Sequence, residues 1–186
     1  IMRYLSKAKR GIDSTTKENV LVVAVKMERE GSKAVRALEN EAFWLQKLNA
    51  HGIGPKFIRF RDRALVMEYI EGQPFVEWYE QHSKKQRKGM ITKIFRQCRI
   101  LDALRVNKLE MHHPVKHIII RKNEPIMIDF ERCKRTLKPK NVTQFCQFLL
   151  SLGEKADAEK LRTLLMKYKK NYDENDFEKI IRLFVS

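Results

Sequence analysis

Two charged residues, Lys26 and Glu41, stand at positions where the sequence predicts that they meet. Lys26 follows an apolar, valine-rich run that predicts a buried strand. Glu41 keeps helical spacing with Leu38 and Leu45, which places it on the apolar face of a helix. A carboxylate on a core face needs a cationic partner, because an unpaired buried charge is costly. Lys26 would provide one, unless Glu39 takes that place or Glu41 reaches solvent at the edge of the face.

A second acidic position, Asp129, directly follows the short apolar run Ile126–Ile128 and precedes Phe130 and Glu131. Aspartate offers the oxygen ligands that Mg²⁺ takes, and lysine binds phosphate as a point charge. These residue types are therefore suited to phosphate chemistry. The alternative is an ordinary aspartate that ends a strand and caps a turn.

Further titratable residues precede the second pair of apolar runs. Glu110 is a carboxylate that could orient a hydroxyl and accept its proton. His112, His113 and His117 raise a zinc hypothesis, since residues four apart are ligand neighbours on a helix. Pro114 lies inside that spacing and discourages a helix, so zinc is the weaker interpretation.

The elements that must position these residues are expected to be mainly β in the first part of the chain. A turn around residues 61–63 predicts a hairpin, and Gly52–Pro55 interrupts the chain before it. Ser32 is a plausible N-cap for the one helix of this part. The expected elements are a strand ending at Leu5, a strand over 20–25, a helix over 32–48 and a hairpin of 56–60 with 64–69.

From Gly72 on, the sequence becomes mainly helical around a second hairpin. Apolar residues recur at helical spacing from Ile91 to Leu104, over about four turns. The expected helices cover 75–81, 91–104, 142–152, 156–168 and 174–184, and the expected hairpin joins 115–120 to 126–130. The fold class predicted is therefore α+β.

In this order, the motifs resemble those of small atypical protein kinases of archaeal type, relatives of the RIO kinases and of the small kinase in the KEOPS complex. The phrases that carry the resemblance are Glu41-Ala-x-x-Leu45, Gly52-Ile-Gly-Pro55, Met67-Glu-Tyr-Ile-Glu-Gly72 and Ile128-Asp-Phe130. The resemblance covers about residues 3–152 and implies a two-lobed protein kinase-like fold. It implies an N-lobe over 1–70, which binds the nucleotide, and a helical C-lobe over 71–186 with the catalytic hairpin.

The resemblance also implies ATP and Mg²⁺ as cofactors and a role for each site residue. Lys26 would hold the α and β phosphates, Glu41 would orient Lys26, and Asp129 would bind Mg²⁺. Backbone groups after Met67 would face adenine. The expected catalytic residues are Glu110, Lys116 and Asp129; the expected cofactor-binding residues are Gly11, Lys26, Glu41, Met67, Glu68 and Ile70; the expected metal ligands are Asp129 and His117.

Two loops depart from the family pattern. The stretch Ser6–Gly11 keeps only the last glycine of the phosphate-binding loop, although its basic residues could contact phosphate by charge. The catalytic loop allows two registers. One places His112 at the position of the catalytic aspartate and His117 at that of the asparagine. The other, preferred here, places Glu110 at the aspartate position, with Lys116 near the γ-phosphate. His117 is a poor magnesium ligand and could contact phosphate instead.

The length of the C-lobe indicates what it lacks. No Ala-Pro-Glu motif follows Asp129, and 11 residues separate Phe130 from Val142. A minimal C-lobe without the usual activation segment is therefore expected, and a protein or RNA-linked substrate would have to be held differently. The predicted function is a phosphotransferase, a small atypical serine/threonine protein kinase. The alternative is a nucleotide-binding pseudokinase or an RNA-associated module without transfer activity.

The composition of the chain indicates which partners and which cellular location to expect. The chain has 186 residues, a length typical of about one domain. It contains 39 Lys and Arg residues and 23 Asp and Glu residues, which gives a net charge of +16. Such a basic chain is expected to attract polyanions, including nucleic acid. Its three cysteines form no disulfide pattern, and its apolar runs are too short for a membrane span. A cytoplasmic protein without membrane contact is expected.

Overall fold

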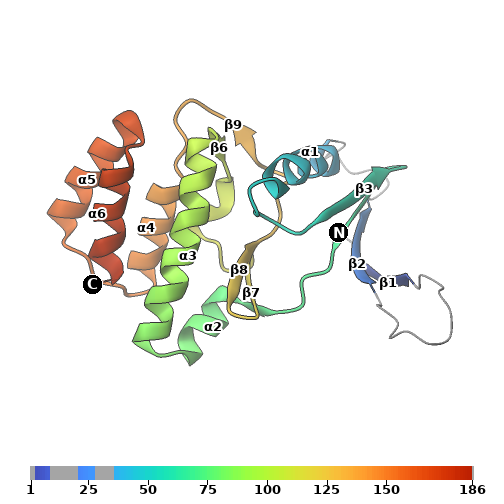
Figure 1. Cartoon of the computed structure of the whole chain (residues 1–186), viewed down its shortest axis with the longest axis horizontal. Helices are drawn as coiled ribbons and strands as arrows, with labels where there is room; N and C mark the ends of the chain where they lie inside the picture. Colours follow the sequence, from blue (N-terminus) through green and yellow to red (C-terminus); the bar gives the residue numbers. More distant parts are fainter. Residues whose placement is uncertain (1–2, 9–20, 28–35, 186) are drawn as a thin grey trace. The chain divides into compact units, whose positions relative to one another are not determined.

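The computed structural model describes residues 3–8, 21–27 and 36–185, which form a mixed α+β structure (Figure 1). The chain divides into two compact units. The first contains Ile1–Glu71 together with Met127–Arg132, and the second contains Gly72–Ile126 together with Cys133–Ser186. The short segment Met127–Arg132 thus groups with residues that precede it by more than fifty positions. Contacts of its Phe130, described below, account for this grouping.

A four-stranded antiparallel sheet forms the frame of the first unit. Its strand order is β1-β2-β4-β3, so that β2 and β4 are central. The strands are β1 (Arg3–Ala8), β2 (Leu21–Met27), β3 (Phe57–Arg61) and β4 (Ala64–Glu68). Val23 of β2 and Leu65 of β4 are buried, as the apolar character of both runs predicts.

The predicted hairpin of β3 and β4 is confirmed. Its turn consists of Asp62 and Arg63, which both have positive φ, at 50° and 57°. A two-residue turn of this backbone type matches the twist of the two strands. Aspartate tolerates the left-handed conformation better than most residues, which suits it to the turn.

One helix, α1 (Ala37–Asn49), contacts β3 and β4. The predicted apolar face is confirmed, because Leu38, Leu45 and Leu48 are all buried. Ser32, the expected N-cap, lies outside the described residues, and the helix begins at Ala37.

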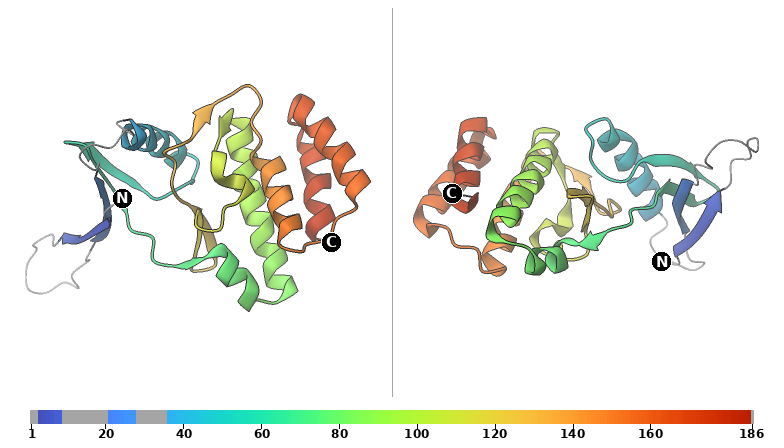
Figure 2. Two further views of the ribbon diagram at one scale, coloured as in Figure 1. Left: turned by 180° about the vertical axis from the view of Figure 1, so that it is seen from behind. Right: turned by 60° about the horizontal axis from the view of Figure 1, so that its bottom comes forward.

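Helices dominate the second unit, as predicted. They are α2 (Phe75–Gln81), α3 (Lys84–Ala103), α4 (Asn141–Ser151), α5 (Ala158–Asn171) and α6 (Glu174–Val185), with a 3₁₀ helix, η1 (Leu109–His112). Helix α6 contacts both α3 and α5, and the views of Figure 2 show α5 and α6 side by side. Helix α3 starts earlier than expected, because Ser83 and Gln86 form a capping box at its N-terminus.

Two small sheets complete the second unit. One has the order β5-β7-β8, and its strands are β5 (Gln73–Pro74), β7 (Ile118–Arg121) and β8 (Glu124–Met127). The other pairs β6 (Val106–Asn107) with β9 (Lys134–Arg135). The predicted second hairpin is confirmed as β7 and β8, with a tighter turn than expected at Lys122 and Asn123, whose φ values are 49° and 64°.

The core of the second unit is rich in phenylalanine. Phe95 of α3 and Phe145 of α4 lie edge to face, with ring centroids 4.9 Å apart. Further buried rings are those of Phe75, Phe148, Phe177 and Phe184. No helix in the described part of the chain is long and apolar enough to cross a membrane.

Candidate functional site

The predicted ion pair between Lys26 and Glu41 is present in the first unit. The ammonium group of Lys26 donates to both carboxylate oxygens of Glu41, at 2.8 Å to Oε1 and 2.7 Å to Oε2. Both residues are buried, and Glu41 is fully excluded from solvent. Breaking a buried pair of this kind costs about 3–5 kcal/mol, because it leaves an uncompensated charge.

Sheet and helix together bring the two side chains into contact. Lys26 lies in central strand β2 opposite Leu65 of β4, and α1 packs on the same sheet. Glu41 lies on the buried face of α1, whereas Glu39, the alternative partner, is exposed. Helical periodicity thus decides which of the two glutamates faces Lys26.

Asp129 joins this pair from the segment that follows β8. Its Oδ1 lies 3.5 Å from the Nζ of Lys26, so one ammonium group faces two carboxylates. The backbone of Asp129 is in the left-handed region, with φ at 67°. Non-glycine residues in that region are uncommon, aspartate is one of those that tolerate it, and such conformations cluster at functional sites.

Phe130 anchors the Asp129 segment to the first unit. Its backbone N–H donates to Oε1 of Glu41 at 3.3 Å, so the same carboxylate holds both Lys26 and this segment. The Phe130 ring packs closely on Gly54: a Cβ at that glycine would lie 2.9 Å from the ring and 2.8 Å from the Leu45 side chain. With φ at 84°, Gly54 is also in a conformation that favours glycine.

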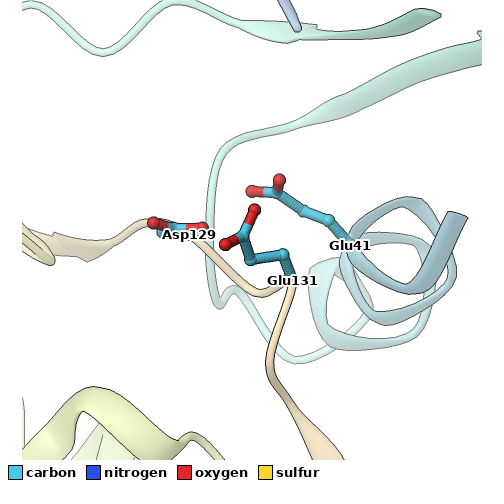
Figure 3. A group of neighbouring side chains, drawn as sticks. All are labelled: Glu41, Asp129 and Glu131. Atoms are coloured by element: carbon cyan, nitrogen blue, oxygen red, sulfur yellow. The ribbon is translucent and has the colours of Figure 1, made fainter. Parts of the chain in front are cut away.

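Glu131 is a site residue that sequence reasoning did not identify as a ligand. Carboxylate oxygens of Glu41, Asp129 and Glu131 lie within 4.8 Å of one another, and Figure 3 shows the three groups converging. The Nδ2 of Asn40 donates to the Glu131 backbone carbonyl at 2.8 Å, which fixes this part of the segment to α1. The sequence shows that a glutamate follows Asp129 and Phe130. It does not show that this glutamate lies near α1, because that contact depends on long-range packing.

The charges at this cluster define what it could hold. The cluster contains three carboxylates and one ammonium group, so its formal charge is two negative charges in excess. Oxygen ligands with excess negative charge fit a hard divalent cation such as Mg²⁺. Since both oxygens of Glu41 already accept from Lys26, Asp129 and Glu131 are the residues suited to bind such an ion.

The segment expected to face adenine continues from strand β4. Met67 and Ile70 are buried, and Glu68 is partly exposed. The backbone N–H of Glu68 donates to the carbonyl of Lys56 at 2.8 Å. The N–H of Glu68 is therefore already used within the first unit.

The other expected catalytic residues belong to the second unit. Glu110 lies in η1, and its Oε2 is 3.7 Å from the Nζ of Lys108, which is fully buried. Lys116 is exposed, and His117 is partly exposed just before β7. The structure thus brings Lys26, Glu41 and Asp129 together in one unit and places Glu110, Lys116 and His117 in the other.

The histidines do not form a zinc site in the described residues. His112 and His113 are exposed, and Nδ1 of His112 is 2.9 Å from the carbonyl of Leu109. Within residues 3–8, 21–27 and 36–185, the acidic cluster is the only group of three or more ligand residues that converges. Gly11 and the basic residues Lys9 and Arg10 of the expected phosphate loop lie outside the described residues.

A buried polar network supports the backbone next to Glu110. Asn141, at the start of α4, accepts from the N–H of Lys108 at 2.8 Å and donates to the carbonyl of Val106 at 2.6 Å. Asp102 of α3 accepts from the Asn141 side chain at 2.7 Å and from Tyr168 at 2.9 Å. The chain that leads into η1 is therefore fixed from three helices.

Burial governs the ionisation of this network. It raises the pKa of Asp102 above its usual value, although the hydrogen bonds from Asn141 and Tyr168 oppose the rise. Burial, followed by the neighbouring charge of Asp102, raises the pKa of Tyr168 well above its usual value. The tyrosine therefore stays a hydrogen-bond donor to the aspartate at physiological pH.

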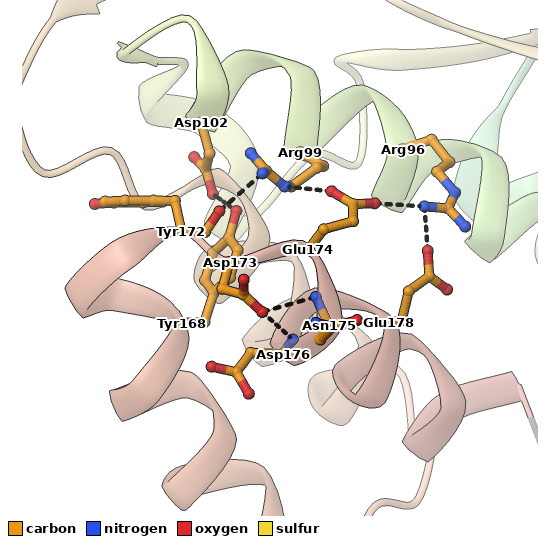
Figure 4. Close-up of polar contacts among 10 residues, drawn as sticks. All are labelled: Arg96, Arg99, Asp102, Tyr168, Tyr172, Asp173, Glu174, Asn175, Asp176 and Glu178. Carbon is orange, nitrogen blue, oxygen red and sulfur yellow. Dashed lines mark hydrogen bonds and ion pairs between the residues drawn. The ribbon is translucent and has the colours of Figure 1, made fainter.

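Next to this network, ion pairs join α3 to α6 (Figure 4). Arg99 pairs with Glu174 at 3.1 Å and also donates to the backbone carbonyl of Tyr172 at 2.8 Å. Arg96 pairs with Glu174 and with Glu178 of α6. These contacts tie the C-terminal helices to α3, and exposed pairs of this kind contribute about 0–1 kcal/mol each.

Comparison of the sequence with protein-family models gives no match, and comparison with curated proteins gives none either. Functional inference therefore depends on the residues of the site.

Proposed function

We propose that the chain is an ATP-dependent phosphotransferase, a small atypical serine/threonine protein kinase with a two-lobed kinase-like fold and a minimal helical C-lobe. The observation that carries the proposal is the position of Lys26, whose ammonium group is shared between Glu41 at 2.7 Å and Asp129 at 3.5 Å. In protein kinases, catalysis requires a lysine paired with a helix glutamate together with an aspartate that binds the metal ion. The same three residue types meet here, on a strand, on a helix and after a strand.

In the proposed reaction, Lys26 holds the α and β phosphates of ATP, and Glu41 keeps its ammonium group in place. Asp129 and Glu131 would hold Mg²⁺, which would supply positive charge that balances the phosphate oxygens. Glu41 would remain bonded to Lys26, because it already uses both oxygens.

The acceptor side of the reaction is assigned to the second unit. The acceptor hydroxyl oxygen attacks the γ-phosphorus, the bond to the β-phosphate oxygen breaks, and ADP leaves. In this proposal, Glu110 would orient the hydroxyl and accept its proton, and Lys116 would act on the γ-phosphate. His117 contacts phosphate rather than the metal ion, because magnesium prefers oxygen ligands.

ADP release from ATP and Mg²⁺ tests the proposal. Asp129→Asn keeps a residue that tolerates positive φ and removes the negative charge, so we expect at least about a hundredfold loss of turnover. Asp129→Ala, which removes the whole carboxylate group, should abolish turnover. Asp62→Asn, at an exposed turn of the same unit, is the matched control and should turn over ATP like the wild type. Turnover at the wild-type rate in both Asp129 variants would overturn the proposal.

A second candidate is a nucleotide-binding module without transfer activity. It is favoured by the distance of 3.7 Å between Glu110 and the buried Lys108, because that ammonium group competes with an acceptor hydroxyl for the carboxylate. Thermal-shift titration with ATP and Mg²⁺, run beside the turnover assay, separates the candidates. Stabilisation by ATP without any ADP release would favour the second candidate.

A further inference from the structure

A short basic segment, defined as Cys133–Lys140, belongs to the second unit. It carries four exposed cations and no acidic residue; they are Lys134, Arg135, Lys138 and Lys140. Among the residues that the structure describes, none of these four side chains forms an ion pair with a carboxylate. Within the described part of the chain, their charges are therefore not neutralised by neighbouring carboxylates.

The backbone of the basic segment is held at several points. Lys134 and Arg135 form strand β9, which pairs with β6. The N–H of Thr136 donates to the carbonyl of Arg105 at 2.9 Å, and the N–H of Lys140 donates to Oδ1 of Asn107 at 2.8 Å. The four cations are thus presented from a fixed backbone, which reduces the entropy lost when a ligand binds.

Side chains from other elements hold the far part of the segment. The hydroxyl of Tyr172 donates to the carbonyl of Pro139 at 3.0 Å. The guanidinium group of Arg105 donates to the carbonyl of Leu137 at 3.0 Å and lies over the Tyr172 ring, 4.4 Å from its centroid. Arg105 therefore adds a fifth positive charge beside the segment while it helps to shape it.

We propose that the basic segment binds the sugar-phosphate backbone of a nucleic acid. Interfaces with nucleic acid are strongly positive and polar, and their affinity comes largely from lysine and arginine contacts to phosphate. Interfaces with proteins instead have an apolar centre from which charged residues are depleted. The segment offers a single exposed apolar side chain, Leu137, among four cations. This inference does not depend on the proposed transfer activity.

The strength of binding follows from the number of charges. Four or five phosphate contacts correspond to sequence-independent binding, with a dissociation constant of about 10⁻⁴–10⁻⁶ M at physiological salt. For a single strand, each contact adds about 0.7 to the slope of log K against log salt concentration, so four contacts account for about 3. The slope therefore counts the cations that take part.

Fluorescence anisotropy with labelled oligonucleotides tests the proposal on the full chain. The probes are single-stranded RNA, single-stranded DNA and duplex DNA of equal length, each titrated over a range of salt concentrations. The test variant replaces all four cations (Lys134→Gln, Arg135→Gln, Lys138→Gln, Lys140→Gln). We expect it to lose at least about tenfold in affinity at low salt and about 3 in the salt slope.

A matched control removes the same charge elsewhere in the second unit. It replaces four exposed cations of α3 and α5 (Lys84→Gln, Lys85→Gln, Lys160→Gln, Arg162→Gln) and should change affinity by less than about threefold. An equal loss in control and test variants would overturn the proposal, because it would assign binding to net charge alone. The two-residue variant Lys138→Glu with Lys140→Glu provides a second test, and unchanged binding by that variant would also overturn it.

Comparison of the probes identifies the class of ligand. A stronger effect with RNA than with DNA assigns the 2′-hydroxyl a part in recognition, and equal effects assign the phosphate backbone alone; both support the proposal. A labelled polyglutamate peptide tests the competing class. Tighter binding of that peptide than of any oligonucleotide, lost in the four-residue variant, would overturn the proposal in favour of an acidic protein partner.

Discussion

The hydroxyl of Tyr168 donates to Oδ2 of Asp102 at 2.9 Å, across 66 positions of sequence. Both residues are buried, and the same carboxylate also accepts from the backbone and side chain of Asn141. One aspartate on α3 thus connects α4 and α5 to each other. Since Asn141 in turn binds the chain that leads into η1, the C-terminal helices support the segment that carries Glu110.

Tyr168→Phe tests the value of this hydrogen bond. The ring and its packing remain, whereas Asp102 loses one donor in a site without water access, so we expect the free energy of unfolding to fall by about 1–3 kcal/mol. Urea unfolding followed by circular dichroism measures the change. Tyr69→Phe, at a partly exposed tyrosine, is the control and should change stability by less than about 0.5 kcal/mol. Equal stabilities of the Tyr168 and Tyr69 variants would contradict the expectation.

Asp102→Asn should reveal a pH dependence. Burial raises the pKa of Asp102 in the folded state above the usual value of 3.8. The folded protein then binds the proton more tightly than the unfolded chain does, so the contribution of Asp102 to stability is full below pH 3.8 and is lost as pH rises through the folded pKa. The stability of the wild type relative to Asp102→Asn should therefore decrease with rising pH and then level off. Urea unfolding of both proteins from pH 3.5 to about 8 measures this, and a relative stability that increases with pH would refute it.

Gly72→Ala and Gly89→Ala should have opposite effects. A Cβ at Gly72 would lie 2.4 Å from the carbonyl oxygen of Ile120, which is backbone and cannot move aside without disturbing β5 and β7. We expect Gly72→Ala to destabilise the protein by about 1–3 kcal/mol. Gly89, inside α3, has open space at the same position, so alanine there should stabilise by about 0.5–1 kcal/mol. Thermal unfolding of the two variants beside the wild type decides whether the signs differ.

Glu41→Gln should affect both stability and nucleotide binding. The amide cannot balance the charge of buried Lys26, and breaking a buried ion pair costs about 3–5 kcal/mol. Asp129, at 3.5 Å from the same ammonium group, should keep the loss near the lower end of that range. On the proposed function, ATP affinity falls as well, because Lys26 is no longer oriented. Isothermal titration with ATP and Mg²⁺ measures the affinity.

The exposed neighbour Glu39→Gln is the control for this experiment. It removes the same charge from the same helix and should leave stability and ATP affinity near those of the wild type. If Glu39→Gln reduced ATP affinity as much as Glu41→Gln, charge on α1 in general would explain the effect, and the ion pair would not.

Local patterns in the sequence were sufficient for most of the longer elements and for one buried pair, but not for the short strands β5, β6 and β9. Helical spacing around Leu38 and Leu45 placed Glu41 on a core face, and the need of a buried carboxylate for a cation led to Lys26. The hairpin at Asp62 and the helix over 75–81 followed from turn residues and apolar periodicity. In each case the deciding interaction lies within a few residues or follows from burial alone.

Residues whose role depends on distant packing were not predicted. Lys108 is fully buried although lysine is normally exposed, and no local sequence pattern predicts this burial. Glu131 approaches Glu41 only because Phe130 docks on Gly54. The last two helices carried no recognisable motif, so the bond from Tyr168 to Asp102 could not be expected. These contacts join residues that are far apart in the sequence, so local patterns do not reveal them.

The grouping of Met127–Arg132 with the first unit has a consequence for how the protein is made. During synthesis, Glu41 leaves the ribosome about ninety residues before Phe130 does, so its carboxylate cannot accept that backbone N–H until those residues have been added. An isolated fragment that ends at Glu71 would lack Asp129 and the ring that covers Gly54. The first unit therefore cannot form completely from its N-terminal residues alone, because Met127–Arg132 belongs to it and is synthesised later.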